Sequence, residues 1–383
     1  MTQSAITIGW QPINSTDDQQ AWVATGPNPL YVGNEVMSTS AMHAIQLGIL
    51  TPPEEQVDPL NAICGTGHCD FPTVKTLGVC AQTSNVTSHL SFADSTVTSY
   101  AELKDFVRME PPEVFEGMGP GVLSQPIRNA SLPTGPYLVG AKHLFSLNMS
   151  TPSHLTPDLR WNPTWMPQNA TLSFGNSDLL GSAISNFFVI WLNQGYFYPN
   201  GTNSSTMPAV NPPSRENVDQ AFRATEVLLH YCVQTYNVTV REGHTTTVLV
   251  DNKTFVESID TTTQRGGEVD GSVTLRPSAN ITANDTANDI LPFRAMADTF
   301  SIFDRHFRPL FAGTFCFDYY RGSGNCVRGL TPGSEAVGHA FWTRTLKREP
   351  LSSQGPTISE LDDLAGKAIE NMSRNVADSL TNR

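Results

Sequence analysis

The sequence predicts an α+β fold, in which antiparallel β-sheets with several packed amphipathic helices are stapled by disulfides. Strand-like and helix-like segments follow one another in mixed order, without the strand–helix–strand rhythm of a parallel sheet. Six cysteines are present, and three of them fall within the seventeen residues from Cys64 to Cys80. With 383 residues, the chain is long enough to bury a large core as one big domain or two.

The N-terminal third combines one helix pattern with several strand patterns. Residues 1–30 are polar and contain three prolines, so we predict an irregular arm there. Apolar side chains at helical spacing predict an amphipathic helix over Glu35–Ile49, which Pro52 and Pro53 terminate. The apolar run Val74–Val79 predicts a buried strand or short helix. Further strands are expected over 86–100, 136–149 and 170–174, and a loop over 110–136.

The middle of the chain contains its most apolar stretch, Leu179–Tyr198, which we interpret as a core element rather than a partner-binding surface. Asn217–Tyr236 places its apolar side chains on one stripe and predicts a helix buried on one side. A hairpin turning at Glu242-Gly243 follows over Asn237–Val250. Residues 261–288 are rich in Thr, Gly and Asn and predict an exposed loop.

Two helical spacings lie near the C-terminus. Phenylalanines recur every three or four residues in Leu291–Leu310, a stripe typical of a core element. Thr357 and Glu360 form a capping box, and an apolar stripe runs along the helix predicted from there to Arg383. We therefore divide the chain into the arm 1–30, a main region 31–350 and a C-terminal helical segment 351–383. The main region has possible lobes 31–198 and 214–350 joined by the loop 199–213.

Six cysteines allow fifteen connectivities, so sequence alone leaves the disulfide pairing open. Gly65 and Gly67 permit a tight turn between Cys64 and Cys69, and Cys316 and Cys326 bracket a short turn-like segment. If these two local pairs form, a long-range Cys80–Cys232 bond remains. Its larger loop predicts the largest contribution to stability, about 5 kcal/mol against roughly 2 to 3 kcal/mol for the local pairs.

The composition is that of a glycosylated protein. Charged residues make up only 15% of the chain, against the usual ~25%, while serine and threonine together number 72. N-glycosylation sequons occupy 12 of the 25 asparagines, where chance placement predicts about five. We therefore expect the chain to pass through a secretory lumen and to carry N-linked glycans. The acceptors are Asn14, Asn85, Asn129, Asn148, Asn169, Asn200, Asn203, Asn237, Asn252, Asn280, Asn284 and Asn371.

Three stretches resemble one family. They are the run Cys64-Gly-Thr-Gly-His-Cys69 with Phe71-Pro72 and Leu77-Gly-Val-Cys80, the segment Ala224–Tyr236 around Tyr231-Cys232-Val233, and the closing segment Ala368–Arg383. Together they resemble the ectodomain of fungal, multi-pass membrane proteins of unknown function, the domain-of-unknown-function family numbered 3176. The resemblance extends from about Tyr31 onward. Thr83 and Val227 stand where family members often have cysteines, which is consistent with one disulfide lost whole.

This resemblance implies an extracytoplasmic domain between membrane spans, with the C-terminal helix close to the last span. The chain itself begins with Met1–Trp10, which has neither the basic start nor the apolar core of a signal peptide, and no apolar run of 18 residues occurs. We therefore expect membrane insertion to depend on flanking spans that are not part of this sequence.

Motifs that would indicate an enzyme or a cofactor site are not found. The sequence contains no Gly-x-Ser-x-Gly elbow, no His-Glu-x-x-His helix and no phosphate-binding loop with lysine, and we predict no cofactor. Cys64, His68, Cys69 and Asp70 could be drawn as a metal site, but a second ligand pair at zinc-finger spacing is missing. His230 and His306 are interpreted as local structural residues rather than catalytic ones.

The net charge argues against two kinds of partner, and two function classes remain. The net charge is −13 with only six lysines and no basic run, which argues against nucleic acid or anionic lipid as a partner. The leading hypothesis is a non-enzymatic, extracytoplasmic domain of a fungal membrane protein with a binding, sensing or structural role, whose ligand is unknown. The alternative is a secreted hydrolase acting on glycans through paired Asp and Glu residues.

Overall fold

The structure is a computed structural model that describes part of the chain. The described residues are 10–12, 19–24, 39–50, 62–95, 127–134, 137–139, 145–150, 171–175, 178–192, 219–260, 272–277, 293–296, 306–307, 309–317, 326–329, 337–338, 340 and 358–381.

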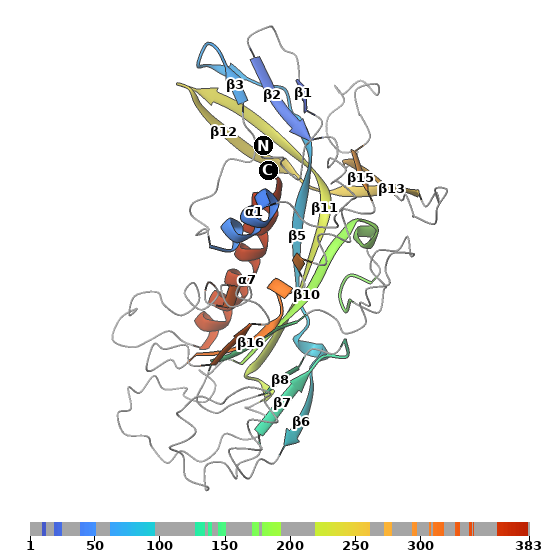
Figure 1. The fold of residues 1–383 in the computed structure, drawn as a ribbon, viewed down its shortest axis with the longest axis vertical. Coiled ribbons are helices and arrows are strands. Elements are labelled where there is room, and N and C mark those ends of the chain that lie inside the picture. The colour runs from blue at the N-terminus through green and yellow to red at the C-terminus, as the bar shows by residue number, and fades with distance from the viewer. Residues whose placement is uncertain are drawn as a thin grey trace.

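One long strand, β11 (Phe222–Arg241), forms the spine of the molecule (Figure 1). Its 20 residues span roughly 65 Å at the usual rise of an extended chain. One edge pairs with β5 (Val74–Asn85) and β4 (Cys69–Asp70), and the other pairs with β10 (Ala183–Leu192) and β12 (His244–Asp251). Every one of these pairings is antiparallel, so four strands are held in register by a single central strand.

The remaining strands extend this sheet or form three smaller ones, and all of their pairings are antiparallel. The eight-stranded sheet runs β12-β11-β10-β9-β16-β17, with β4 and β5 joined to β11; β9 is Phe145–Ser150, β16 is Gly313–Phe317 and β17 is Cys326–Gly329. The three-stranded sheets combine β1 (Trp10–Pro12), β2 (Gln19–Ala24) and β3 (Ala62–Cys64); β6 (Ser91–Ser95), β7 (Ile127–Ser131) and β8 (Tyr137–Val139); and β13 (Thr254–Asp260), β14 (Ser272–Pro277) and β15 (Phe293–Met296).

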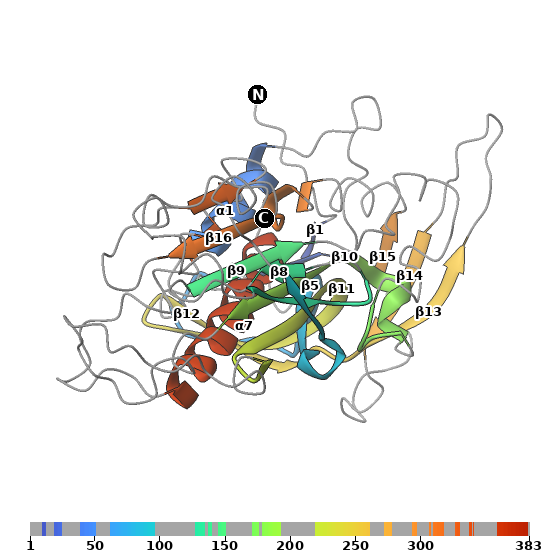
Figure 2. The same cartoon turned by 90° about the horizontal axis from the view of Figure 1, so that it is seen from below.

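The two helices whose bounds are described lie beside this sheet. The helix α1 (Thr39–Leu50) packs on α7 (Ile358–Thr381), and α7 in turn contacts β5. Figures 1 and 2 both show α7 on one side of β5 and β11, with β13 and β15 on the opposite side. Side chains of both helices and of β14 and β15 join those of β5, β10 and β11 in a single core cluster.

The prediction of a helix over Asn217–Tyr236 was wrong, because most of this segment belongs to β11. From Glu226 to Tyr236 every residue is buried, so neither face of the strand shows the polar positions that would reveal a period of two. A continuously buried strand and a buried helix have the same apolar pattern, and the β-branched and aromatic residues of this segment favour the strand.

The described residues are mostly antiparallel sheet, so the expected several packed amphipathic helices are reduced to two among them. Both had been predicted, as Glu35–Ile49 and as the helix that follows Thr357. None of the helices in the described part of the chain is long and apolar enough to cross a membrane.

Several strand predictions are confirmed. The stretch Val74–Val79 lies in β5, and all ten residues of β10, in the most apolar segment, are buried. The segments 86–100 and 136–149 contain β6, β8 and most of β9. The hairpin turns at Glu242 and Gly243, whose φ angles of 52° and 77° are the left-handed pair that a two-residue turn needs. Phe293 and Phe307 of the aromatic stripe are buried in the core.

Other local predictions were wrong. The strands β1 and β2 form inside the segment 1–30, and β2 depends on pairing with the distant β3, which local composition does not reveal. Residues 171–175 form bends and a turn, not a strand. The segments predicted as loops contain β7 and the buried β14. Residues 31–38, 199–213 and 351–357 lie outside the described residues, so the proposed lobes and linker remain predictions.

Gly48 lies where α1 meets α7. A β-carbon at this position would lie 2.5 Å from the Cα of Val376 and 2.6 Å from the carbonyl oxygen of Asn375. Both are backbone atoms of α7, so a side chain would force the two helices apart. Glycine at residue 48 therefore sets the distance between the helices.

We predict that Gly48→Ala lowers the free energy of unfolding by about 1 to 3 kcal/mol, the usual cost of overpacking a tight contact. Gly366 in α7 is the matched control, since a β-carbon there meets nothing within 4 Å. Gly366→Ala should raise the stability by about 0.5 to 1 kcal/mol. Urea titrations of both variants measure this, and equal effects at the two positions would contradict the close helix contact.

Candidate functional site: the disulfide-linked strands and the sequon surface

The long-range disulfide joins Cys80 on β5 to Cys232 on β11, residues that are 152 positions apart in the sequence. In the ladder Cys80 lies opposite His230 and Cys232 lies opposite Gly78, so the bond runs diagonally between two paired strands. Both cysteines are buried, at 5% and 0% exposure, which keeps solvent and dissolved thiols away from the bond. This is the long-range pairing that remains if Cys64–Cys69 and Cys316–Cys326 form the two local pairs.

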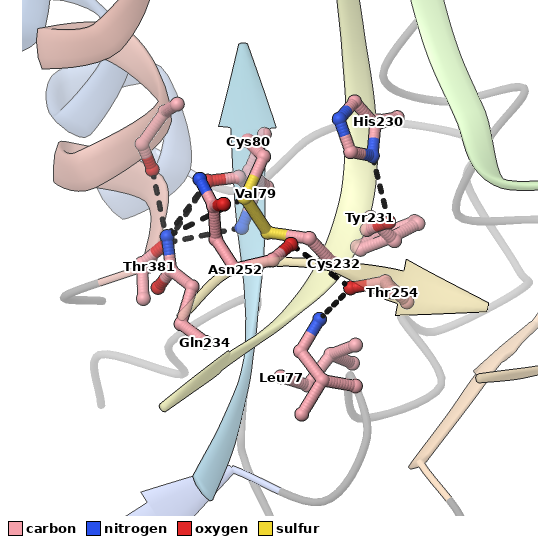
Figure 3. Close-up of a disulfide and its surroundings, with 12 residues drawn as sticks. Leu77, Val79, Cys80, His230, Tyr231, Cys232, Gln234, Asn252, Thr254 and Thr381 are labelled. Atoms are coloured by element: carbon pink, nitrogen blue, oxygen red, sulfur yellow. Dashed lines mark hydrogen bonds between the residues drawn. A yellow bond between two sulfur atoms is a disulfide. The ribbon is translucent and has the colours of Figure 1, made fainter. Parts of the chain in front are cut away.

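Polar side chains tie the disulfide to the last turn of α7 (Figure 3). The Gln234 side-chain amide donates to the Val79 carbonyl at 3.3 Å and to the sulfur of Cys80 at 3.7 Å. The backbone N–H of Val79 donates to the Thr381 hydroxyl at 3.0 Å, and this hydroxyl donates to the Ala377 carbonyl at 3.0 Å. The helix end thus satisfies a backbone donor on the edge of β5 that β11 does not reach.

The local disulfide joins Cys64 to Cys69, as predicted, with their Cα atoms 6.1 Å apart. Gly67 has a φ of 73°, which explains why this turn needs a glycine at that position. Its carbonyl accepts a hydrogen bond from the backbone N–H of Gly243, and Arg241 forms an ion pair with Asp70. The turn is therefore docked on the β11–β12 hairpin, and its two sulfurs are bonded to each other instead of being available as metal ligands.

The third predicted pair has the required strand register. Cys316 on β16 lies directly opposite Cys326 on β17. Their side chains lie outside the described residues, so the bond itself remains a prediction.

The structure places the side chains of five of the twelve sequon asparagines. Asn85, Asn237 and Asn252 are exposed, and Asn129 and Asn371 are half-buried. Asn371 lies on α7, where Ser373 of its sequon is buried and donates to the Ile369 carbonyl. Described side chains do not include the other seven, which are Asn14, Asn148, Asn169, Asn200, Asn203, Asn280 and Asn284.

A buried carboxylate that the sequence analysis missed lies on β11. Glu226 has 0% exposure, and its oxygens accept hydrogen bonds from the backbone N–H groups of Leu172 and Ser173 and from the Asn186 side-chain amide. These bonds fix residues 171–175 against the sheet and explain why they do not form a strand. In a strand, Glu226 lies on the same face as Ala224 and Leu228, which are both buried. Had the segment been interpreted as a strand, this position would have indicated a buried acid.

A second polar cluster joins β7 to the start of β11. Arg128 binds both oxygens of Asp219, at 2.6 and 2.8 Å, and one oxygen of Asp94 at 2.8 Å. These hydrogen bonds, chiefly the one to Asp219, raise the pKa of Arg128. Its guanidinium carbon also lies 5.4 Å from the ring centre of Phe92, within cation–π range. The two acids are thus bound to one arginine.

Three wholly or partly buried groups have pKa values shifted from their usual ranges. Burial lowers the pKa of His230 to about 4, and its Nδ1 lies 3.0 Å from the Tyr231 carbonyl. Burial also raises the pKa of Asp378 on α7 to about 6, although Arg374 acts in the opposite direction. The pKa of Tyr236 is raised by burial first and by the nearby Asp378 second. His230 is therefore neutral in the fold above about pH 4, as a core histidine is; His306 is half-buried.

No protein-family model, curated protein or solved structure matches the chain. Within the described part of the chain, no group of three His, Cys, Asp or Glu side chains is arranged to hold a metal ion. The candidate site thus consists of two disulfides and three exposed sequon asparagines. Nearby acids are hydrogen-bonded within the fold, as Glu226 is to backbone amides and Asp94 and Asp219 are to Arg128.

We predict that the two disulfides differ strongly in their contribution to stability. The pair of changes Cys80→Ala and Cys232→Ala should cost about 5 kcal/mol, because the bond closes a loop of 152 residues. Cys64→Ala with Cys69→Ala is the matched control and should cost about 2 kcal/mol for its short loop. Thermal melts of both double variants compare them, and a larger loss for the short loop would contradict this account.

The burial of Asp378 predicts a pH-dependent effect of Asp378→Asn. The folded pKa of about 6 lies above the ordinary value of 3.8, so the fold favours the neutral acid. This contribution is complete below pH 3.8 and is lost as the pH rises through 6. Asparagine does not ionise, so the variant should match wild type near pH 4 and be more stable at pH 7 by up to about 3 kcal/mol.

Denaturant titrations from pH 4 to pH 8 measure this difference. The exposed Asp363 on the same helix provides the control Asp363→Asn, which removes a carboxylate that is not desolvated. A gain at pH 7 that is as large for the control would show that the net charge of the helix, rather than burial of Asp378, determines the effect.

Proposed function

We propose that this chain is an extracytoplasmic, N-glycosylated domain of a fungal membrane protein, with a binding or structural role and without catalysis of its own. The observation that carries the proposal is the buried Cys80–Cys232 bond between paired strands. Disulfides that serve structure form in oxidising compartments, and a buried bond cannot serve as a freely accessible redox couple.

The sequons provide independent support for the same compartment. Asn85, Asn237 and Asn252 are exposed, as an oligosaccharide attached to a folded protein requires. Their excess over chance and the resemblance of the cysteine motif to the fungal membrane family point in the same direction. Membrane attachment through flanking spans rests on that resemblance.

A secreted glycan hydrolase is less well supported. Such an enzyme needs two carboxyl groups facing an open cleft, one of them protonated at the start of the reaction. Glu226 is fully buried and binds backbone amides, while Asp94 and Asp219 are both bound to Arg128. We therefore favour the non-enzymatic role.

Peptide mass spectrometry on protein from the cells that naturally make it tests the proposal. We expect glycans on Asn85, Asn237 and Asn252, and Cys80 and Cys232 recovered as one disulfide-linked peptide pair that resists alkylation. Alkaline carbonate extraction of the same cells should leave the protein in the membrane pellet. Bare asparagines together with alkylated Cys80 and Cys232 would contradict an extracytoplasmic location.

A further inference from the structure

The strand β12 exposes an unusual amount of apolar surface. Val248, Leu249 and Val250 follow one another along it and are 56%, 47% and 49% exposed. Among the described strands β12 pairs only with β11, so it forms an edge of the eight-stranded sheet. An exposed apolar edge strand is a template for association with other chains, and proteins normally protect such edges with charge, proline or a covering element.

The strand β12 contains no proline and no charged residue in its interior that would prevent another strand from pairing with this edge. Its sequence from His244 to Asp251 is His-Thr-Thr-Thr-Val-Leu-Val-Asp, with ionisable side chains only at its two ends. By contrast, the free edge of β5 is covered by the end of α7 through the Val79–Thr381 hydrogen bond. The cover for β12 must therefore come from elsewhere.

A sequon asparagine lies directly beside the exposed residues. In the β11–β12 ladder Asn237 is the cross-strand partner of Val248. Side chains of directly opposed residues project from the same face, with their β-carbons about 5 Å apart. Asn237 is exposed, and its side-chain oxygen accepts a hydrogen bond from the Thr73 hydroxyl at 3.4 Å. The side-chain nitrogen, which would carry the sugar, is thereby turned away from that bond.

A second sequon lies where β12 ends. Asn252 is exposed in the turn between β12 and β13, directly after Asp251. Thr254 of this sequon accepts a hydrogen bond from the Val233 backbone N–H at 2.7 Å and donates to the Asn252 carbonyl at 3.3 Å. The turn is thus anchored to β11, which fixes the place where a glycan on Asn252 would leave the surface.

We propose that an N-glycan on Asn237 covers Val248 and shields the edge strand β12 from association, with a glycan on Asn252 guarding the end of the same strand. The first N-acetylglucosamine has an apolar ring face and an acetyl methyl group, and both suit contact with a valine side chain. The sugar thereby removes apolar area from water, and its bulk blocks a second strand from pairing. This inference rests on the proposed extracytoplasmic location.

Secreted, glycosylated protein provides the test. Thr239→Ala removes the sequon and keeps Asn237 with its Thr73 contact. Thr239→Ser, which changes the same residue but keeps the sequon, is the matched control. Thr239→Ala should lower the melting temperature by about 2 to 4 °C more than the control and should produce concentration-dependent self-association in light scattering. Adding Val248→Thr to Thr239→Ala should abolish most of the additional association.

The outcomes separate this inference from the proposed function. Occupied Asn85 and Asn252 with a bare Asn237 would overturn the glycan cover and leave the extracytoplasmic location intact. Three bare sites would overturn the glycan cover, and alkylated Cys80 and Cys232 in the same protein would overturn the extracytoplasmic location as well. An occupied Asn237 whose loss changes neither the melting temperature nor the association beyond the control would overturn the cover. Wild-type glycoprotein that is already dimeric, with its dimer disrupted by Val248→Thr, would assign β12 to a second copy of the chain instead.

Discussion

The fold depends on the pairing of β11 with β5. Twelve residues of each strand are in register, and the Cys80–Cys232 bond fixes that register in the middle of the ladder. A slip by one residue would move Cys232 to the other face and leave Glu226 and His230 pointing away from their buried sites. The register also positions β10 and β12 on the other edge of β11, so an error there would extend through the whole sheet.

The two edges of the central sheet differ in how they are protected. The end of α7 covers β5, and it does so with Thr381, a residue 302 positions later in the chain than Val79. The strand β12 has no comparable element among the described residues, and three consecutive apolar side chains are exposed along it. The protein therefore uses its own C-terminal helix to protect one edge, and we assign the protection of the other edge to carbohydrate.

The sequence revealed local features better than long-range ones. The two helices, the Glu242-Gly243 turn and the tight Cys64–Cys69 loop follow from neighbouring residues, and each was predicted. The strand β11 was mistaken for a helix because both of its faces are buried, which removes the period of two that identifies a strand. The strand β2 depends on a partner far away in the sequence. The roles of Glu226 and Asp378 depend on elements that fold against them, so residue type alone could not identify them.

The 152-residue separation of Cys80 and Cys232 has a consequence for synthesis. Chains elongate at about 5 to 20 residues per second, so Cys80 emerges roughly 8 to 30 seconds before its partner. During this interval Cys64 and Cys69 are the nearest thiols, and a bond from Cys80 to either of them would form first by proximity. Native pairing therefore depends on early closure of the Cys64–Cys69 loop, or on an isomerase that reverses the wrong bond. Early closure of the small disulfide thus removes the competing partners of Cys80 before Cys232 emerges.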